Sequence, residues 1–402
     1  MRGLIEKIAV MFRRLPPWGP PAQPSTRLGR EPVDHVLLFD GTMGSLKPHQ
    51  VTSIGLLYQY LRRSGLHHSL YYGKGLQWRE WRELSDLWFG WGVNRQIQRA
   101  YGWLAMRYRP GDRVFLIGYS RGAFAARSLA GMIERVGLLR SDAAIERNVS
   151  MAWRHYEGGA RPETLQGFKA SLCHDTCPIE MVGAFDTVMG LGFQLPLLWM
   201  LSEPRYRFHD HHLGPSVKHG FQALAIEETR SIFEPLIWDC EGTGAGRVEQ
   251  VWFRGCHGDI GGQLSGREES RPLANIPLVW MLERAEELAF ALPDTWREDF
   301  PTDPAAPSVG SWSGWGKLFL FRAPRIVGRD PSERIHESAI GARRSWQTIL
   351  VPGVLRRTFQ PSPAEAPAAP SGSGGHDEAG GSAGGIESPV RRPTDLAAGD
   401  AG

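Results

Sequence analysis

Short apolar runs alternate along this chain with segments that have helical spacing. The apolar runs lie at residues 35–39, 114–117, 179–185 and 221–226, and two further short strands are expected at residues 69–73 and 249–253. Mostly apolar runs of this length predict strands that are buried on both faces, as the strands of a parallel sheet are. Segments of helical periodicity lie between and after them, at residues 52–61, 93–107, 142–170 and 277–292. The alternation therefore predicts an α/β fold with a mostly parallel, doubly wound sheet.

One stretch carries a strong local signal, residues 114–132, with the sequence VFLIGYSRGAFAARSLAGM. Its apolar run breaks at the pentapeptide GYSRG and resumes as an alanine-rich segment with helical spacing, which predicts a strand, a sharp turn and a helix. G-x-S-x-G in that setting is the nucleophile elbow of α/β-hydrolases, where the glycines let a strained turn form. The predicted fold is thus an α/β-hydrolase-like sheet with helical insertions, and Ser120 is the candidate nucleophile.

Two further residues complete a candidate catalytic triad. Asp186 directly follows the apolar run 179–185, and His257 follows the run 249–253 in a stretch rich in glycine. In hydrolases of this plan the nucleophile, the acid and the base occur in that order along the chain. We therefore predict Asp186 as the acid and His257 as the general base. Asp259, two residues after the histidine, is expected to orient or shape the loop.

The first apolar run, 35–39, ends in the sequence Asp40-Gly41-Thr42. Loops after the carboxyl ends of parallel strands build the site in a doubly wound sheet. The backbone amides of Gly41 and Thr42 are therefore candidates for the oxyanion hole, together with the amide of Arg121, the residue after the nucleophile. The alternative is that Asp40 only caps a turn.

Composition and charge narrow the class of protein. The chain has 402 residues, of which 42% are hydrophobic, which suffices for a large core. The net charge is only +3 and no long basic run occurs, so no nucleic-acid partner is expected. Four cysteines fit incidental core thiols or a reducing compartment rather than a disulfide framework. The sequence Cys173-His174-Asp175-Thr176-Cys177 lacks a second pair at zinc-finger spacing and is interpreted as loop or core.

No transmembrane helix is expected, because no apolar run reaches the roughly 18 residues that a membrane-spanning helix needs. The N-terminus also lacks the uninterrupted apolar core of a classical signal peptide. These features predict a protein that stays in the cytoplasm or is exported by a specialised secretion system.

The pattern divides the chain into three parts. Residues 1–32 form a basic amphipathic segment, suited either to an anionic membrane or to packing on the domain, followed by a proline-rich linker. Residues 33–358 form the catalytic domain. Residues 359–402 are rich in Pro, Ala, Gly and Ser and are expected to be disordered.

Two apolar segments in the catalytic domain have two interpretations each. The tryptophan-rich segment 78–91 lines a substrate cleft or forms an aromatic core insertion. The segment 190–201 forms a buried insertion or, as the alternative, a lid or interfacial contact. Beyond residue 301 the pattern weakens, with a short element expected near residues 335–338.

Several blocks together resemble one family, the α/β-hydrolase domain of unknown function 2235, which includes the class-one lipase effectors of type VI secretion. The blocks are LLFDGT (37–42), GYSRGAFAARSLAGMI (118–133), VGAFDTVMGLG (182–192), VKHGFQALAIEETRSIFEPLIW (217–238), QVWFRGCHGDIGG (250–262) and LVWMLERA (278–285). The resemblance implies Ser120, Asp186 and His257 as the triad, and phospholipid esters as substrates of the effector members. It also shows departures, since Tyr119 replaces the family's usual Phe, Met43 a Trp and Gln263 a glycine.

The main hypothesis is a serine esterase or lipase of phospholipase type, acting on phospholipid or other lipid esters without a metal or organic cofactor. One alternative is a membrane-associated binding module on a hydrolase scaffold, using the basic N-terminus and residues 193–201 for peripheral membrane contact. A second alternative is a metal-dependent phosphoesterase that uses Asp40, Asp186, His257 and Asp259.

Overall fold

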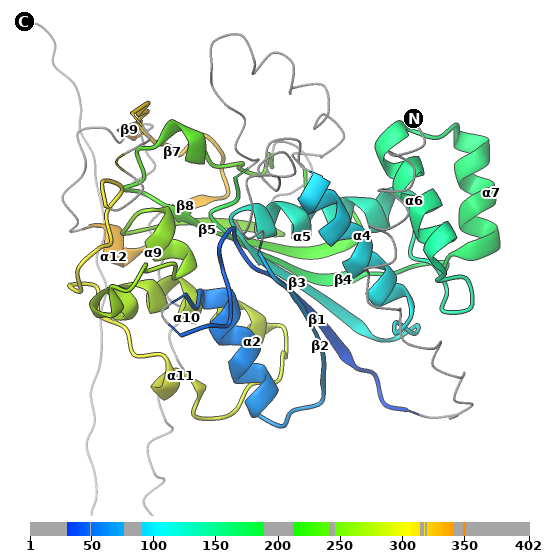
Figure 1. The fold of residues 1–402 in the computed structure, drawn as a ribbon, viewed down its shortest axis with the longest axis horizontal. Helices are drawn as coiled ribbons and strands as arrows, with labels where there is room; N and C mark the ends of the chain where they lie inside the picture. The colour runs from blue at the N-terminus through cyan, green and yellow to red at the C-terminus, as the bar shows by residue number, and fades with distance from the viewer. Residues whose placement is uncertain are drawn as a thin grey trace, which may run out of the picture. The chain divides into compact units, whose positions relative to one another are not determined.

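A sheet of seven parallel strands forms the centre of the fold (Figure 1). The computed structural model describes residues 30–48, 50–75, 91–188, 212–240, 246–313, 317, 320–340 and 349–350. The strand order is β2-β1-β3-β4-β5-β6-β8. The strands are β1 Asp34–Phe39, β2 His68–Gly73, β3 Arg113–Tyr119, β4 Ile179–Phe185, β5 Val217–Ala225, β6 Val248–Phe253 and β8 Glu333–Ile335. The predicted mostly parallel α/β sheet is confirmed.

Helices cover both faces of this sheet. The α-helices are α2 Ser53–Arg63, α4 Trp91–Ala105, α5 Arg121–Val136, α6 Glu146–Gly158, α7 Pro162–Leu172, α9 His257–Gly261, α10 Arg271–Glu287, α11 Trp296–Asp299 and α12 Glu337–Ile340. Two 3-10 turns, η3 Ser231–Phe233 and η4 Glu268–Ser270, and a small parallel sheet of β7 Ile326–Val327 with β9 Ile349–Leu350 complete the described elements.

The strands in the middle of the sheet are mostly apolar because they are buried from two sides. Along β1, Val36 and Leu38 belong to the core that includes residues of α2 and α10. Leu37 and Phe39 point the other way and belong to the core that includes residues of α4 and α5. Figure 1 shows these two helix pairs on opposite faces of the sheet. Most positions in such a strand are therefore apolar, and the buried Gln222 of β5 and Gln250 of β6 are exceptions.

The strand order reverses direction at one point in the sheet. From β1 the chain adds β2 on one side, and it then returns to add β3 on the other side. A crevice forms at the carboxyl ends of the strands where the order reverses, and ligands bind there in open α/β sheets. Here the residues that follow the two flanking strands are Asp40, after β1, and Ser120, after β3.

Two helix predictions need correction. The single helix predicted over residues 142–170 is two helices, α6 and α7, because Gly159 ends the first in a left-handed conformation with φ 62°. The helix predicted to begin at Pro277 begins at Arg271 instead, and Pro272 occupies its first turn. Pro277 lies inside this helix, whose residues from 273 to 278 are all buried, so packing outweighs the hydrogen bond that the proline removes.

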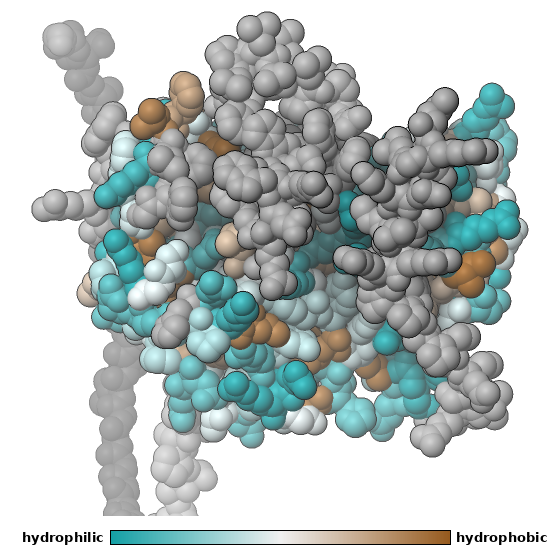
Figure 2. Space-filling view, viewed as in Figure 1, coloured by the Kyte–Doolittle hydropathy of each residue, from teal (hydrophilic) through white to brown (hydrophobic). Residues whose placement is uncertain are grey.

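The weak element near residues 335–338 is the edge strand β8 followed by α12. The four cysteines are free thiols and are buried, in agreement with core positions. On the face drawn in Figure 2, hydrophobic residues of the described chain occur singly or in small groups among hydrophilic ones. Among the described residues, no helix has both the length and the apolar character that crossing a membrane requires.

Several predictions concern residues outside the described ones: the N-terminal segment up to residue 29, the tryptophans at 78–90, the apolar segment 190–201 and the tail 359–402. The chain divides into two units, Met1–Gln360 and Pro361–Gly402. All described residues belong to the first unit.

Candidate active site

Ser120 sits in a strained turn between β3 and α5. Its backbone has φ 57° and ψ −121°, a combination that costs energy for any residue other than glycine. The glycines on either side make the turn sterically feasible. A Cβ on Gly118 would lie 2.4 Å from the carbonyl oxygen of Gly122, and a Cβ on Gly122 would lie 2.2 Å from the carbonyl oxygen of Phe39. The structure contains the strand, the turn and the helix that the sequence predicts around Ser120.

The close contact at Gly122 gives a stability prediction. We expect Gly122→Ala to lower the free energy of unfolding by about 1 to 3 kcal/mol, because the backbone of β1 cannot yield to the added methyl group. Gly167→Ala is the matched control, since Gly167 is also helical but a methyl group added there would have no atom within 4 Å. The control is expected to gain about 0.5 to 1 kcal/mol. Urea unfolding of the two variants measures both values, and equal stabilities would contradict the steric account.

The three predicted triad residues lie in hydrogen-bonding contact. His257 Nε2 is 2.9 Å from Ser120 Oγ, and His257 Nδ1 is 2.6 Å from Asp186 Oδ2. All three side chains are buried. They come from the carboxyl ends of β3, β4 and β6, which the parallel sheet brings to one edge. The order nucleophile, acid, base along the chain thus corresponds to three loops at that edge, after β3, β4 and β6, with β5 between the last two strands.

Asp186 is held as a charged acceptor by its surroundings. Its side chain is fully buried, and the guanidinium of Arg325 lies 3.3 and 3.2 Å from its two carboxylate oxygens. The amide of Ala225 also donates to Oδ1 at 3.2 Å. Burial alone would raise the pKa of Asp186, but the charge of Arg325 and the hydrogen bond with His257 outweigh it and hold the pKa below its usual value. The carboxylate is therefore ionised opposite the imidazole at neutral pH.

The imidazole of His257 is held by packing as well as by hydrogen bonds. It stacks on the ring of Phe233, with centroids 4.5 Å apart and an angle of 10° between the planes. The ring of Tyr119 also contacts it, at a centroid distance of 4.9 Å. The backbone amide of His257 donates to Glu228 Oε2 at 3.1 Å, and Glu228 in turn pairs with Arg230. These contacts fix the ring so that its two nitrogens face the serine and the aspartate.

The loop after β1 meets the start of α5. The guanidinium of Arg121 donates to the hydroxyl of Thr42. The amide of Gly41 donates to Asp40 Oδ1 at 2.8 Å, so this predicted oxyanion donor is engaged by the neighbouring carboxylate. Among the described residues, the amide of Thr42 has no partner. Asp40 stabilises this loop, because its carboxylate also accepts hydrogen bonds from the hydroxyls of Thr52 and Tyr72, at 2.7 and 2.6 Å.

The three residues at which the sequence departs from the resembling family lie close together. The hydroxyl of Tyr119 is 3.3 Å from Gln263 Oε1 and 3.2 Å from the carbonyl oxygen of His257. Gln263 Nε2 donates at 2.9 Å to the carbonyl oxygen of Thr42, the residue before Met43. Burial raises the pKa of Tyr119 well above its usual value, so its hydroxyl remains a donor. Tyr119 and Gln263 thus connect the histidine loop to the loop after β1.

Asp259 has a structural role in the histidine loop. Its carboxylate accepts from the amides of Cys256 and Val309, each at 2.8 Å, and from the hydroxyl of Ser308 at 2.6 Å. It therefore caps α9 and fixes a neighbouring loop, as expected for a loop-shaping residue. Within the described ranges, no three His, Cys, Asp or Glu side chains form a group that could hold a metal ion.

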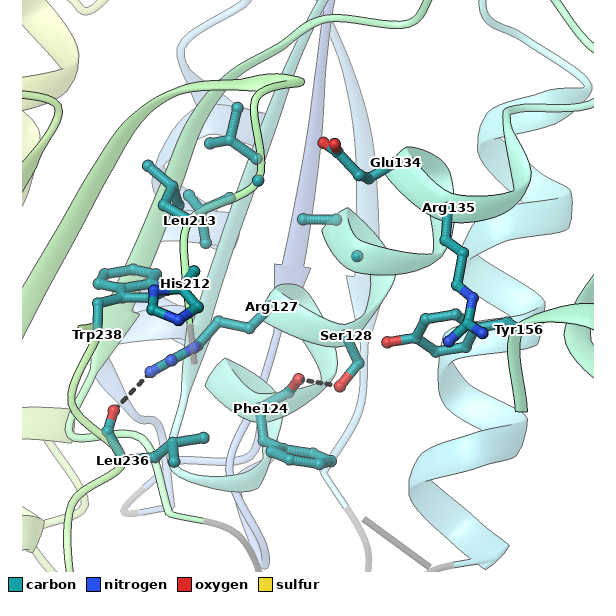
Figure 3. Close-up of a pocket in the computed structure, with 15 residues that line it drawn as sticks. Phe124, Arg127, Ser128, Glu134, Arg135, Tyr156, His212, Leu213, Leu236 and Trp238 are labelled. Carbon is teal, nitrogen blue, oxygen red and sulfur yellow. Dashed lines mark hydrogen bonds between the residues drawn. The ribbon is translucent and has the colours of Figure 1, made fainter. Parts of the chain in front are cut away.

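A cavity of about 410 Å³ lies along α5 (Figure 3), and none of the predicted site residues lines it. Its most buried charge is Arg127, which donates to Gln222 Oε1 and to the carbonyl oxygen of Leu236, at 3.1 and 2.5 Å. The guanidinium lies 4.4 Å from the ring centroid of Trp238, and burial lowers its pKa to about 9. Gln222 Oε1 also accepts from the hydroxyl of Thr187 at 3.2 Å. Arg127 is thus linked through Gln222 of β5 to Thr187, the residue that follows Asp186.

Three residues at the site were not predicted as functional. Phe233 and Glu228 lie in the block 217–238 that resembles the family, so the sequence signalled the segment but not the contacts with His257. Arg325 lies in the region where the sequence pattern is weak. An arginine between a proline and an isoleucine carries no local signal, and only the folded chain brings it to Asp186.

The parallel sheet, the strained serine turn and the loops that meet at the reversal of strand order define an α/β-hydrolase-like protein. Within that class, the chain belongs to the family described as type VI secretion system, phospholipase effector Tle1-like, catalytic domain, whose model matches residues 34–284. The resemblance seen in the sequence is thereby confirmed.

Individual relatives match parts of the chain. It is 32% identical over 228 residues to the uncharacterized protein YEL023C of Saccharomyces cerevisiae, a match that covers 50% of this chain and 32% of that protein. A crystal structure of an uncharacterized protein from Pseudomonas aeruginosa has 16% identity and a TM-score of 0.42, over 68% of this chain and 49% of the other. A structure of the Tle1 effector bound to the VgrG spike from the type 6 secretion system has 16% identity and a TM-score of 0.34, over 57% of this chain and 51% of the other. The chain spans about half or less of the length of these proteins.

Proposed function

We propose that this protein is a serine hydrolase that cleaves the carboxylic esters of phospholipids. The observation that carries the proposal is the hydrogen-bonded series from Ser120 Oγ through His257 to Asp186, with distances of 2.9 and 2.6 Å. A nucleophile within reach of a base, with the base oriented by a third group, is the arrangement that activates a serine.

In the proposed reaction His257 Nε2 takes the proton of Ser120 as the serine oxygen attacks the ester carbonyl. Asp186 accepts the hydrogen bond from Nδ1 and stabilises the imidazolium that forms. The imidazolium then gives its proton to the departing alcohol, and an acyl-serine remains. Water hydrolyses this acyl group in a second half-reaction with the same base, which releases the fatty acid.

The oxyanion of the tetrahedral intermediate needs donors that are already in place. We propose the backbone amides of Arg121 and Thr42 for this role. Thr42 is held from both sides, because Arg121 donates to its hydroxyl and Gln263 donates to its carbonyl oxygen. Gly41, with its amide bonded to Asp40, is assigned to the shape of the loop.

The family match supports a lipid substrate, because its members are described as phospholipase effectors. Export as a type VI effector, and contact with a spike protein such as the VgrG of the solved Tle1 complex, belong to the same proposal.

The products of phospholipid cleavage test the proposal. Purified protein incubated with phospholipid in mixed detergent micelles is expected to release fatty acid and lysophospholipid, and to do so equally well with a chelator present. Release of diacylglycerol or phosphatidic acid, lost on addition of the chelator, would instead favour the metal-dependent phosphoesterase. Folded protein that releases no fatty acid from phospholipids or from simple esters would contradict the proposal.

A further inference from the structure

Large hydrophobic side chains are exposed at only a few described positions, and most of these belong to loops beside the candidate triad. Six such residues are exposed among the described ones: Met43, Ile145, Trp312, Leu320, Phe321 and Ile340. Leu320 is 77% exposed, Phe321 69% and Trp312 55%. We call Met43, Trp312, Leu320 and Phe321 the apolar rim. Contiguous exposed apolar side chains, such as the adjacent Leu320 and Phe321, mark an interaction surface.

Backbone hydrogen bonds connect the apolar rim to the histidine of the triad. The carbonyl oxygen of Phe321 accepts from the amide and the hydroxyl of Ser231, at 3.2 and 3.0 Å. Ser231 begins η3, and Phe233 at the end of η3 is the ring stacked on His257. The amide of Ala323 donates to the carbonyl oxygen of Thr229 at 2.8 Å, so residues 321–323 pair with residues 229–231 at both ends. The exposed pair Leu320 and Phe321 therefore stands beside the candidate site.

A second connection runs from the same segment to the catalytic acid. Arg325, which contacts both carboxylate oxygens of Asp186, follows Phe321 by only four residues. Four residues span at most about 14 Å of extended chain. Met43 belongs to the loop after β1, and the hydroxyl of Ser311, the residue before Trp312, is 3.0 Å from the hydroxyl of Thr229. All four rim residues thus belong to loops gathered at the carboxyl edge of the sheet.

The charge of this segment is mainly positive. From Pro304 to Arg329, both included, the sequence holds four basic residues and no Asp or Glu. Arg325 is buried against Asp186, which leaves Lys317, Arg322 and Arg329 as the basic residues of the segment that can face a membrane. One of them, Arg322, has its guanidinium 3.7 Å from the ring centroid of Trp312 and donates to Thr229 Oγ1 at 2.9 Å. Lys317 is exposed between Trp312 and Leu320. Apolar side chains flanked by basic ones suit the surface of an anionic lipid bilayer, where the former enter the headgroup region and the latter meet phosphate groups.

We propose that the apolar rim is the surface by which this protein docks on anionic lipid membranes, with Leu320 and Phe321 entering the headgroup region. Docking there presents the serine to lipids in the same bilayer. The inference rests on the proposed function for the substrate, but it names a surface that the triad does not require, so soluble esters reach the serine without it.

The test uses the full chain with both rim residues changed, Leu320→Ser with Phe321→Ser. The matched control is Ile145→Ser, since Ile145 is 55% exposed and precedes α6 instead of contacting the site loops. Binding is measured by co-sedimentation with vesicles of equimolar phosphatidylcholine and phosphatidylglycerol, in a Ser120→Ala background so that no lipid is consumed. Turnover is measured with Ser120 intact, on the same vesicles and on p-nitrophenyl butyrate in solution.

We expect the double variant to lose vesicle affinity and vesicle turnover by about tenfold or more, because two apolar side chains no longer leave water. Its turnover of p-nitrophenyl butyrate should match that of the unchanged protein, and Ile145→Ser should match it in all three assays. Vesicle binding by the double variant equal to that of the control would overturn the proposal. If no variant hydrolyses any ester, the proposed function fails, while the sedimentation result still decides whether the rim binds lipid.

Discussion

Replacement of Ser120 by alanine is expected to lower ester turnover by about 10⁴- to 10⁶-fold, because the variant lacks the oxygen that attacks the ester. The loss should appear in kcat on a soluble ester such as p-nitrophenyl butyrate. The turn that holds the residue has φ 57° and ψ −121° and is stabilised by the neighbouring glycines, not by the hydroxyl. The variant should therefore fold like the unchanged protein, which circular dichroism and thermal unfolding can check.

Ser128→Ala is the matched control for this variant. Ser128 lies two turns further along α5, is buried, and donates its hydroxyl to the carbonyl oxygen of Phe124 at 2.7 Å. Its replacement removes a buried hydroxyl from the same helix without touching the triad, so turnover should remain near that of the unchanged protein. Turnover retained by Ser120→Ala, or lost equally in both variants, would remove Ser120 from the role of nucleophile.

Asp186→Asn is expected to reduce kcat by about 10⁴-fold, because an amide fails to hold the histidine in the required tautomer and does not stabilise the imidazolium. Asparagine is the least disruptive replacement, since it tolerates the positive φ of 42° at this position. The substitution also removes the ion-pair partner of the buried guanidinium of Arg325, so some stability should be lost as well. Steady-state kinetics on a soluble ester, below the unfolding temperature of the variant, separates the two effects.

Asp259→Asn serves as the comparison, because Asp259 is a buried carboxylate only two residues from the histidine in the sequence. Its oxygens accept from Cys256, Ser308 and Val309 and do not contact the imidazole. Its replacement should lower stability and leave most of the turnover of the folded fraction. A larger loss of kcat in Asp259→Asn than in Asp186→Asn would reverse the assignment of the acid.

The elements that build the core could be predicted from the sequence because burial on both faces leaves a continuous apolar signal. Residues 35–39 and 179–185 are examples, and the polar residues after them mark the edge at which a parallel sheet collects its functional loops. Ser120, Asp186 and His257 could be predicted from the sequence for that reason. Each directly follows a strand or lies a few residues after one, in an order typical of the fold.

The contacts that refine the site depend on segments far apart in the chain. Arg325 reaches Asp186 across 139 positions, and nothing in its local sequence distinguishes it from other arginines. Whether the amide of Gly41 is available depends on the side-chain rotamer of Asp40, which no sequence pattern encodes. The prediction that a helix starts at Pro277 was wrong, because a proline inside a helix is tolerated when the helix is buried by packing on the sheet.

The central claim is that Ser120 is an activated nucleophile. A fluorophosphonate probe reacts covalently with serines that a neighbouring base has activated, and its attachment does not depend on the natural substrate. The purified protein and its Ser120→Ala variant should both be treated with the probe and the site of attachment mapped by mass spectrometry. Labelling of the unchanged protein at Ser120, with none in the variant, is the predicted result. Folded protein that remains unlabelled, or a label on another residue, would contradict the account.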